Sequence, residues 1–291
     1  MKWPNSKQFA FTIIDDTDGS TIENTKPVYE FLHSLGFKTT KTVWVYPPRD
    51  EFSGSSLQDP EYLSFVKDLH EKGFEIGLHN VGSGRFLRDE IIEGVRYFKG
   101  LFPDAKIHVN HSRNPCNLYW GYERFYWLKP LFRILGKGRK FSGSVIESDC
   151  YWADVAKSEF KYIRNLVFNG ANTLGYDPTM PYISKNKPES NYWFSSSDGH
   201  TIDEFLELTK PDNLERLKAS GGACIVYTHF ASGFVESSGN LNPDFVKRMK
   251  ALSEMNGYFE PASTILDYLL KEKKGAREVG SLLESFFLES R

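Results

Sequence analysis

Short apolar runs with the composition of β-strands alternate with amphipathic helical segments through the first 110 residues, and this alternation constrains the fold more than any other feature. Strands joined by helical crossovers pair in parallel, because a crossover returns the chain to the same edge of the sheet. The pattern therefore predicts an α/β fold whose parallel sheet is either closed into a barrel or doubly wound. The four predicted strands are residues 9–14, 38–46, 74–78 and 106–110.

The second half of the chain is less regular but contains the same kinds of segment. We expect further strands at 141–146, 191–196 and 223–227. We expect helices at 214–219, 245–255 and 264–274. No internal repeat and no linker rich in Gly, Ser or Pro divides the chain. The sequence therefore predicts one domain over residues 1–275, followed by an amphipathic helical tail over 276–291 that packs on this domain or on a second subunit.

The composition is that of a folded protein without a strong charge. Lys and Arg number 36 against 38 Asp and Glu, the net charge is −2, and 40% of the residues are hydrophobic. This balance excludes a disordered chain and gives no indication of nucleic acid as a partner. The widely spaced Cys116, Cys150 and Cys224 match neither a disulfide framework nor a zinc finger. With no apolar signal segment and no run of 18 apolar residues, we expect a cytoplasmic protein with free thiols and no transmembrane helix.

Residues capable of metal binding and proton transfer stand where the predicted strands end. In parallel α/β folds these ends meet at one face, which is where ligands bind. Paired carboxylates need a cation beside them, neutral histidine is a zinc ligand, and an arginine keeps a carboxylate ionised. Each residue alone also has a plain structural explanation, as a helix cap, a buried histidine or a surface ion pair. The residues are Asp15, Asp16, His79, His111, Arg113 and His229.

Together and in this order, these residues resemble the motifs of the polysaccharide deacetylase family. Ile13-Ile14-Asp15-Asp16-Thr17 is similar to the family's opening Thr-Phe-Asp-Asp-Gly, and the stretch 73–77 leads to His79 as in its second motif. Arg113-Asn114-Pro115 resembles the third motif, 226–229 the fifth, and 257–261 the closing phrase. The resemblance implies a distorted (β/α) barrel that carries a metal-dependent carbohydrate N-deacetylase.

The same resemblance implies a role for each motif residue. Asp15 would be the general base and Arg113 would orient it. Asp16 and His79 would be metal ligands. His229 would be the general acid that protonates the leaving amine.

One position departs from the family pattern. The family's second histidine ligand lies four residues after the first, and Ser83 occupies that position here. Serine is a poor zinc ligand. Either His111 supplies the missing ligand from the neighbouring strand, which we favour, or the metal is lost and the protein only binds carbohydrate. Asp18 is a spare carboxylate that could assist.

The expected reaction is hydrolysis of an acetamido group by a site that holds one divalent metal, Zn²⁺ in the first instance. The expected substrate is an N-acetylated sugar or a lipid-linked oligosaccharide of surface-polysaccharide (O-antigen-like) biosynthesis. A hydrolase of another small molecule stays open as an alternative. Residues 117–135 alternate aromatic and basic side chains, which suits either peripheral membrane contact or a helix packed on the barrel. The aromatic residues expected to line the sugar site are Trp44, Tyr46, Tyr119 and Trp120.

Overall fold

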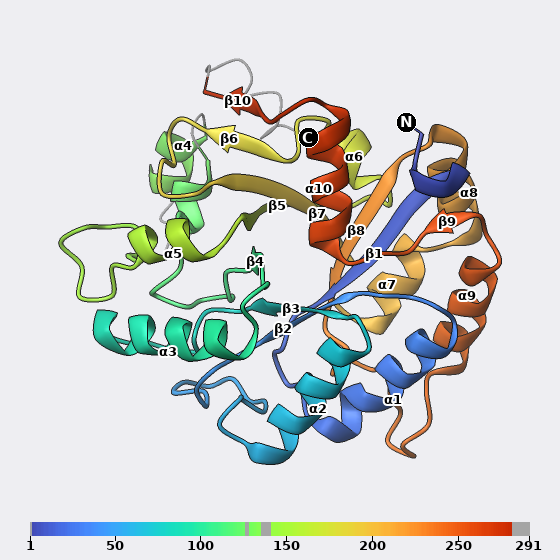
Figure 1. Ribbon diagram of the computed structural model, residues 1–291, viewed down its shortest axis with the longest axis horizontal. Helices are drawn as coiled ribbons and strands as arrows, with labels where there is room; N and C mark the ends of the chain where they lie inside the picture. The colour runs from blue at the N-terminus through green and yellow to red at the C-terminus, as the bar shows by residue number, and fades with distance from the viewer. Residues whose placement is uncertain (1, 126–127, 135–140, 281–291) are drawn as a thin grey trace.

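The computed structural model describes residues 2–125, 128–134 and 141–280 (Figure 1). Within them, seven parallel strands close into a barrel, because β8 pairs with both β7 and β1. The strands of the barrel, in order around it, are β1 (Phe9–Asp15), β2 (Thr40–Val43), β3 (Glu75–Leu78), β4 (Ile107–His108), β5 (Tyr162–Phe168), β7 (Tyr192–Asp198) and β8 (Ala223–Thr228). The α/β class and the barrel closure predicted from the sequence are therefore confirmed.

Three short strands extend the sheet beyond the barrel. β9 (Gly257–Tyr258) pairs with β1, and β6 (Tyr182–Ser184) runs antiparallel to β7. β10 (Arg277–Val279) pairs in parallel with β6. The first residues of the predicted helical tail are therefore a strand, and its remaining residues, 281–291, lie outside the described part of the chain.

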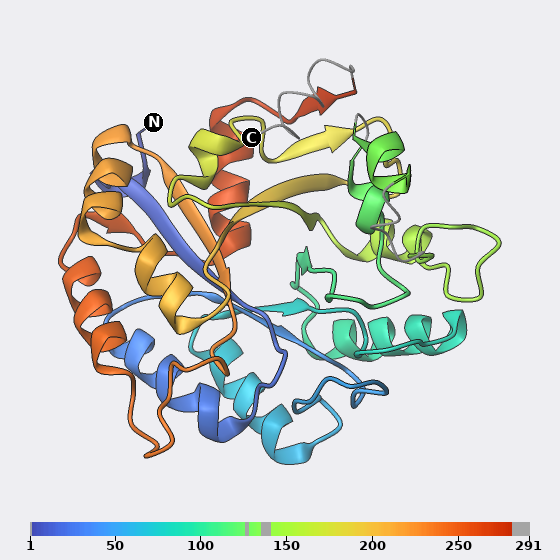
Figure 2. The same cartoon turned by 180° about the vertical axis from the view of Figure 1, so that it is seen from behind.

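Helices cover the outside of the barrel, as Figures 1 and 2 show from opposite sides. The longer ones are α1 (Ile22–Ser34), α2 (Pro60–Glu71), α3 (Arg88–Leu101), α8 (Pro211–Ser220), α9 (Pro243–Ser253) and α10 (Ala262–Glu272). The shorter ones are α4 (Lys129–Ile134), α5 (Ala153–Glu159), α6 (Thr173–Tyr176) and α7 (Ile202–Leu208), with 3₁₀ turns η1 (Pro4–Ser6) and η2 (Gly121–Arg124).

Local sequence explains where these elements form and which side they bury. Thr21 caps α1 and exchanges hydrogen bonds with Asn24, which satisfies free amides of the first turn. In α3, Ile91, Val95 and Phe98 lie on one buried face, at the spacing of an amphipathic helix. Every residue of β1 is buried, because a parallel barrel strand is covered on both sides.

One predicted strand is wrong, and one strand of the barrel was missed, as were the short strands β6, β9 and β10 outside it. Residues 141–146 form turns rather than a strand. The barrel strand that was missed is β5, whose apolar run is interrupted by Arg164 and Asn165. Both polar side chains are buried, and Arg164 enters the candidate site described below. The pattern failed here because two buried polar residues stand where an apolar run was expected.

No helix in the described ranges is both long enough and apolar enough to cross a membrane.

Candidate metal centre

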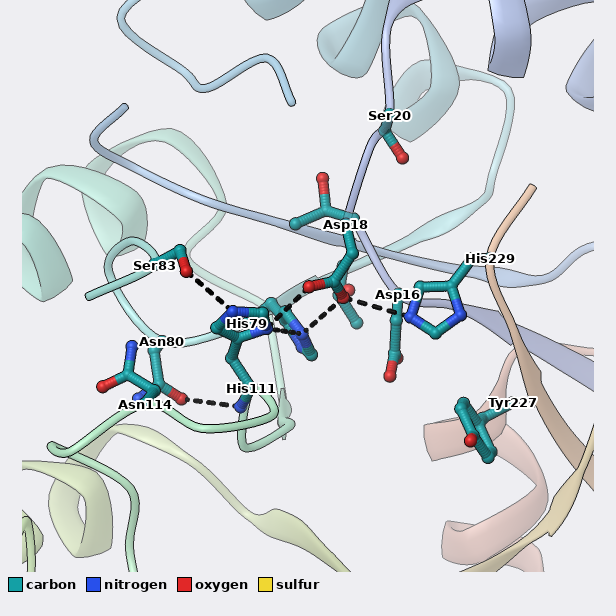
Figure 3. A network of polar contacts seen from close by, with 12 residues as sticks. Asp16, Asp18, Ser20, His79, Asn80, Ser83, His111, Asn114, Tyr227 and His229 are labelled. Carbon is teal, nitrogen blue, oxygen red and sulfur yellow. Dashed lines mark hydrogen bonds and ion pairs between the residues drawn. The ribbon is translucent and has the colours of Figure 1, made fainter. Parts of the chain in front are cut away.

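Three side chains from three loops converge at the carboxyl end of the barrel strands (Figure 3). Asp18 follows β1, His79 follows β3 and His111 follows β4. His79 Nε2 lies 3.2 Å from Asp18 Oδ2 and 3.2 Å from His111 Nδ1. His111 Nδ1 lies 2.7 Å from Asp18 Oδ1. Two imidazole nitrogens and a carboxylate oxygen therefore form a group that is able to hold a metal ion.

The way these atoms approach one another fits a shared cation. Asp18 Oδ1 is buried and makes no hydrogen bond to any described residue, although His111 Nδ1 is close to it. Ligands of one ion show this arrangement because their lone pairs point at a common centre and not at each other. Two histidines and one carboxylate are a donor set for zinc or another divalent transition metal, with positions left for water and substrate.

His111 is held by a hydrogen-bonded chain behind the group. Ser83 Oγ lies 2.7 Å from Asp50 Oδ1 and 2.7 Å from His111 Nε2. Since a carboxylate only accepts, the Ser83 hydroxyl donates to Asp50 and its oxygen accepts from His111 Nε2. In neutral His111 the lone pair is then on Nδ1, which faces Asp18 and His79. Ser83 thus does not belong to the group itself but orients His111 within it.

An amide framework fixes the two histidine loops relative to each other. The Asn80 side chain accepts from the His111 backbone N–H at 3.3 Å and donates to Asn117 Oδ1 at 3.0 Å. The Asn117 amide donates in turn to the His111 carbonyl at 2.5 Å. Asn114 donates to the Gly82 carbonyl at 2.7 Å. The loops after β3 and β4 are therefore connected by side-chain bonds at the site itself.

A second set of polar groups faces the metal group from the other side. Arg164 holds Asp16 through two parallel hydrogen bonds of 3.0 and 2.5 Å. His229 Nε2 lies 3.1 Å from Asp18 Oδ2, and its Nδ1 donates to the His200 carbonyl at 3.2 Å. Figure 3 shows Asp18 between the two histidines on one side and His229 on the other. Asp16, Asp18 and His229 form a second group with the geometry to hold a cation.

These contacts set the protonation states. Burial acts to raise the pKa of Asp16, but Arg164, with His79 and His229, outweighs it and leaves the pKa below its usual value. Burial acts to lower the pKa of His229, but Asp18 and Asp16 outweigh it and raise the pKa. For His79, burial prevails and lowers the pKa, which favours the neutral form that a metal ligand requires. The site thus pairs an ionised carboxylate with an imidazole that favours its charged form.

Asp16, Asp18, His79, Arg164 and His229 line one cavity of about 570 Å³, a size typical of small-molecule sites, whereas His111 is fully buried behind its wall. It is lined by carboxylates, histidines and arginines together with Trp120 and Tyr227. The charged and titratable residues of its lining are Asp16, Asp18, Glu51, His79, Arg113, Arg124, Arg164, Asp198, His200 and His229.

Two expectations for Asp15 and Arg113 are corrected by this structure. Asp15 is fully buried outside the cavity lining, where it pairs with Lys41 at 2.8 Å and accepts from Tyr29 and the Phe230 amide. Arg113 does not orient it, because Arg113 is exposed and pairs with Glu51 at 3.3 Å. Adjacent strand residues point to opposite faces, so only Asp16 reaches the cavity. Its arginine comes from β5 instead.

Of the four aromatic residues predicted to line the sugar site, one lines the cavity and three do not. Trp120 lines the cavity. Trp44 is fully buried with its ring edge-on to His111 at 5.3 Å, so it supports the metal group from behind. Tyr46 stacks on Phe86 and donates to the Glu90 carbonyl, away from the cavity. Tyr119 packs on Trp193. Only Trp120 is placed to contact a ligand.

Several site residues could not be read from the sequence. Asp18 was noted only as a spare carboxylate, and Arg164, His200 and Asp50 carried no motif. Only Asp18 had a usable signal, its position four residues after the end of the strand predicted at 9–14. Arg164 reaches Asp16 across 148 positions of sequence, which no local pattern reveals.

Comparison with known proteins adds little beyond the fold class. No family model matches the sequence, and the search of curated proteins found no match. A candidate polysaccharide deacetylase of O-antigen biosynthesis from Bordetella bronchiseptica aligns over 99% of this chain and 94% of its own, with 11% identity and a TM-score of 0.41. Phospho-2-dehydro-3-deoxyheptonate aldolase from Thermotoga maritima aligns over 93% and 72%, with 16% identity and a TM-score of 0.40. At these values the likenesses carry no argument about chemistry, and membership of the polysaccharide deacetylase family stays a prediction.

Proposed function

We propose that this chain is a metal-dependent hydrolase that removes the acetyl group from an N-acetylated sugar. The observation that carries the proposal is the pairing of a buried Asp-His-His metal group with Asp16 and His229 in one cavity. Amide hydrolysis needs a polarised carbonyl, an acceptor for a water proton and a donor to the leaving nitrogen. The site offers residues for each of these roles: the Asp-His-His group for a metal, Asp16 as acceptor and His229 as donor.

Asp18, His79 and His111 are the residues that would hold the metal. A divalent ion bound there supplies polarisation of the acetyl carbonyl and lowers the pKa of a nearby water towards about 7. Zn²⁺ is the ion we propose from the donor set. Ser83 and Asp50 keep the Nδ1 of His111 available as a ligand.

Asp16 acts as the general base in this proposal. Arg164 keeps its carboxylate ionised and fixes its plane, and a carboxylate with two occupied positions still has lone pairs for a water. Water gives one proton to Asp16 as its oxygen bonds to the carbonyl carbon. The role that the motif assigned to Asp15 and Arg113 thus passes to Asp16 and Arg164.

His229 acts as the general acid. Its Nε2 faces the cavity beside Asp18, and its other nitrogen is held by the His200 carbonyl. It donates a proton to the leaving nitrogen as the C–N bond breaks, and acetate and a free amino sugar result.

The biological substrate and its location are proposed from the sequence motifs alone. We propose an N-acetylated sugar, free or within a lipid-linked oligosaccharide, in surface-polysaccharide (O-antigen-like) biosynthesis. A cytoplasmic location stays a prediction, as does peripheral membrane contact by the segment 117–135, in which residues 126–127 and 135 lie outside the described part of the chain.

Acetate release from N-acetylglucosamine and short chito-oligosaccharides by the zinc-loaded full chain tests the proposal. Activity should require added metal and disappear in Asp18→Asn, with Ser196→Ala as a control for an unrelated buried barrel residue. Bound metal without acetate release from any acetamido sugar would favour a hydrolase of another small molecule. Failure to bind metal would leave only the carbohydrate-binding alternative.

A further inference from the structure

Arg124 is a cation in the cavity that has no counter-ion among the described residues. It ends the 3₁₀ turn η2, and its guanidinium lies over the Trp120 ring at 4.1 Å from the ring centroid. One terminal nitrogen donates to the Asn165 carbonyl, while the buried Nε has no partner in the described part of the chain. A guanidinium carries five N–H donors, so most of its donors remain available to a ligand.

The other two arginines of the cavity differ from Arg124 because each is paired with the carboxylate of another residue. Arg164 is bound by both oxygens of Asp16, and Arg113 pairs with Glu51 at 3.3 Å. Arg124 instead lies near a second positive charge, since burial and then Arg164 lower its pKa to about 10. It still carries its charge at neutral pH, and a partly buried charge without a partner is unfavourable in the free protein.

We infer that Arg124 is an anion-binding subsite of this cavity and that the sugar substrate carries a carboxylate or phosphate as well as its acetamido group. That the ligand is a sugar rests on the function proposed above. The planar fork of arginine matches the two oxygens of a carboxylate or phosphate, and Trp120 holds this fork in one plane. A neutral hydroxyl would leave the charge uncompensated.

The position of Arg124 in the fold suits a specificity role. It comes from η2 in the long segment between β4 and β5, which also carries His111 near its start, whereas Asp18 and His79 come from the loops after β1 and β3. Lys187 supports this segment by donating to the Arg124 carbonyl at 2.7 Å. The proposed base and acid, Asp16 after β1 and His229 after β8, thus stand on different elements from Arg124 in η2, and all three line one cavity.

Equilibrium binding to the full chain tests this inference without relying on turnover. The three probes are N-acetylglucosamine, its 6-carboxylate (the uronic acid) and its 6-phosphate, titrated by calorimetry at fixed ionic strength. The wild type should bind at least one anionic probe about 10-fold or more tightly than the neutral sugar. The probe that gains affinity identifies the anion as carboxylate or phosphate.

Substitution then assigns the preference to Arg124. Arg124→Gln should weaken binding of the preferred anionic probe by about 10- to 100-fold and leave the neutral sugar within about twofold. Arg124→Lys should recover part of the loss, because it restores charge without the fork. Arg113→Gln is the matched control, since this cavity arginine is already paired with Glu51 and should change binding little. Thermal unfolding of each variant checks that it is folded.

The outcomes separate this inference from the proposed function. Equal wild-type affinity for all three probes would overturn it, and so would an equal loss for neutral and anionic probes in Arg124→Gln. Acetate release with no preference for an anionic sugar would keep the hydrolase and remove the subsite. Arg124-dependent anion preference without any acetate release would keep the subsite and refute the hydrolase.

Discussion

Replacing Ser83 with alanine should weaken metal binding although Ser83 is not a ligand. In the wild type its hydroxyl donates to Asp50 and accepts from His111 Nε2, both at 2.7 Å, which directs the Nδ1 lone pair of neutral His111 at the metal group. Ser83→Ala removes both contacts and leaves the His111 ring free to change tautomer and to rotate. Loss of such a supporting contact typically reduces metal affinity by about 10- to 100-fold, or about 1.4–2.7 kcal/mol.

In the assay, the metal-free protein competes for zinc with a chelator of known zinc affinity. The quantity measured is the amount of zinc bound to the protein. Ser196→Ala is the matched control, because Ser196 is an equally buried serine whose hydroxyl has no hydrogen-bond partner in the described ranges. Its zinc affinity should equal that of the wild type. Asp50→Asn should reduce affinity as well, since an amide that donates to Ser83 lets the hydroxyl donate to His111 Nε2 and moves the ring proton to Nδ1.

A folded Ser83→Ala protein that binds zinc within twofold of the wild type would refute the reasoning about the tautomer. The conclusion would then be that Asp18 and His79 alone position His111.

Three further results are expected. Asp16→Asn should reduce kcat by about 10²- to 10⁴-fold with zinc still bound, and near-wild-type turnover would remove Asp16 as the base. Asp18→Asn should abolish stoichiometric zinc, measured by elemental analysis, and zinc retained at full occupancy would contradict its role as a ligand. Burial lowers the pKa of His108 from 6.5 to about 3, so below pH 6.5 the unfolded chain takes up a proton that the folded protein does not. This group should therefore lower the free energy of unfolding by about 2 kcal/mol between pH 7 and pH 5, measured by urea unfolding of the metal-free protein. The variant His108→Phe should lack this part of the pH dependence.

The parallel α/β sheet was predictable because its information is local, whereas its closure into a barrel was expected only from the motif resemblance. Continuous apolar runs mark β1, β3 and β8, and the spacing of Ile91, Val95 and Phe98 marks α3. Prediction failed at β5, where Arg164 and Asn165 interrupt the run, and at residues 141–146, where a β-like composition forms turns. Secondary structure was thus readable except where functional side chains occupy a strand or where tertiary packing overrides a short pattern.

The location of the candidate site was predictable, because parallel strands bring their carboxyl ends together whatever their order around the barrel. Placing His79, His111 and His229 at strand ends was therefore enough to expect them near one another. Serine is a poor zinc ligand, so Ser83 left either His111 from the neighbouring strand or loss of the metal, and His111 as a ligand stays a prediction.

The sequence by itself determined the α/β class, most of the helices and the face on which the chemistry gathers, since these depend on apolar periodicity and on strand direction. Only the tertiary structure decided which partners each carboxylate has. Asp15, Asp16 and Asp18 lie within four residues, yet the first is buried against Lys41, the second is held by Arg164 and the third joins the histidines. The physical reason is that adjacent residues at a strand end point in opposite directions, and their partners come from strands far away in sequence that meet only when the barrel closes.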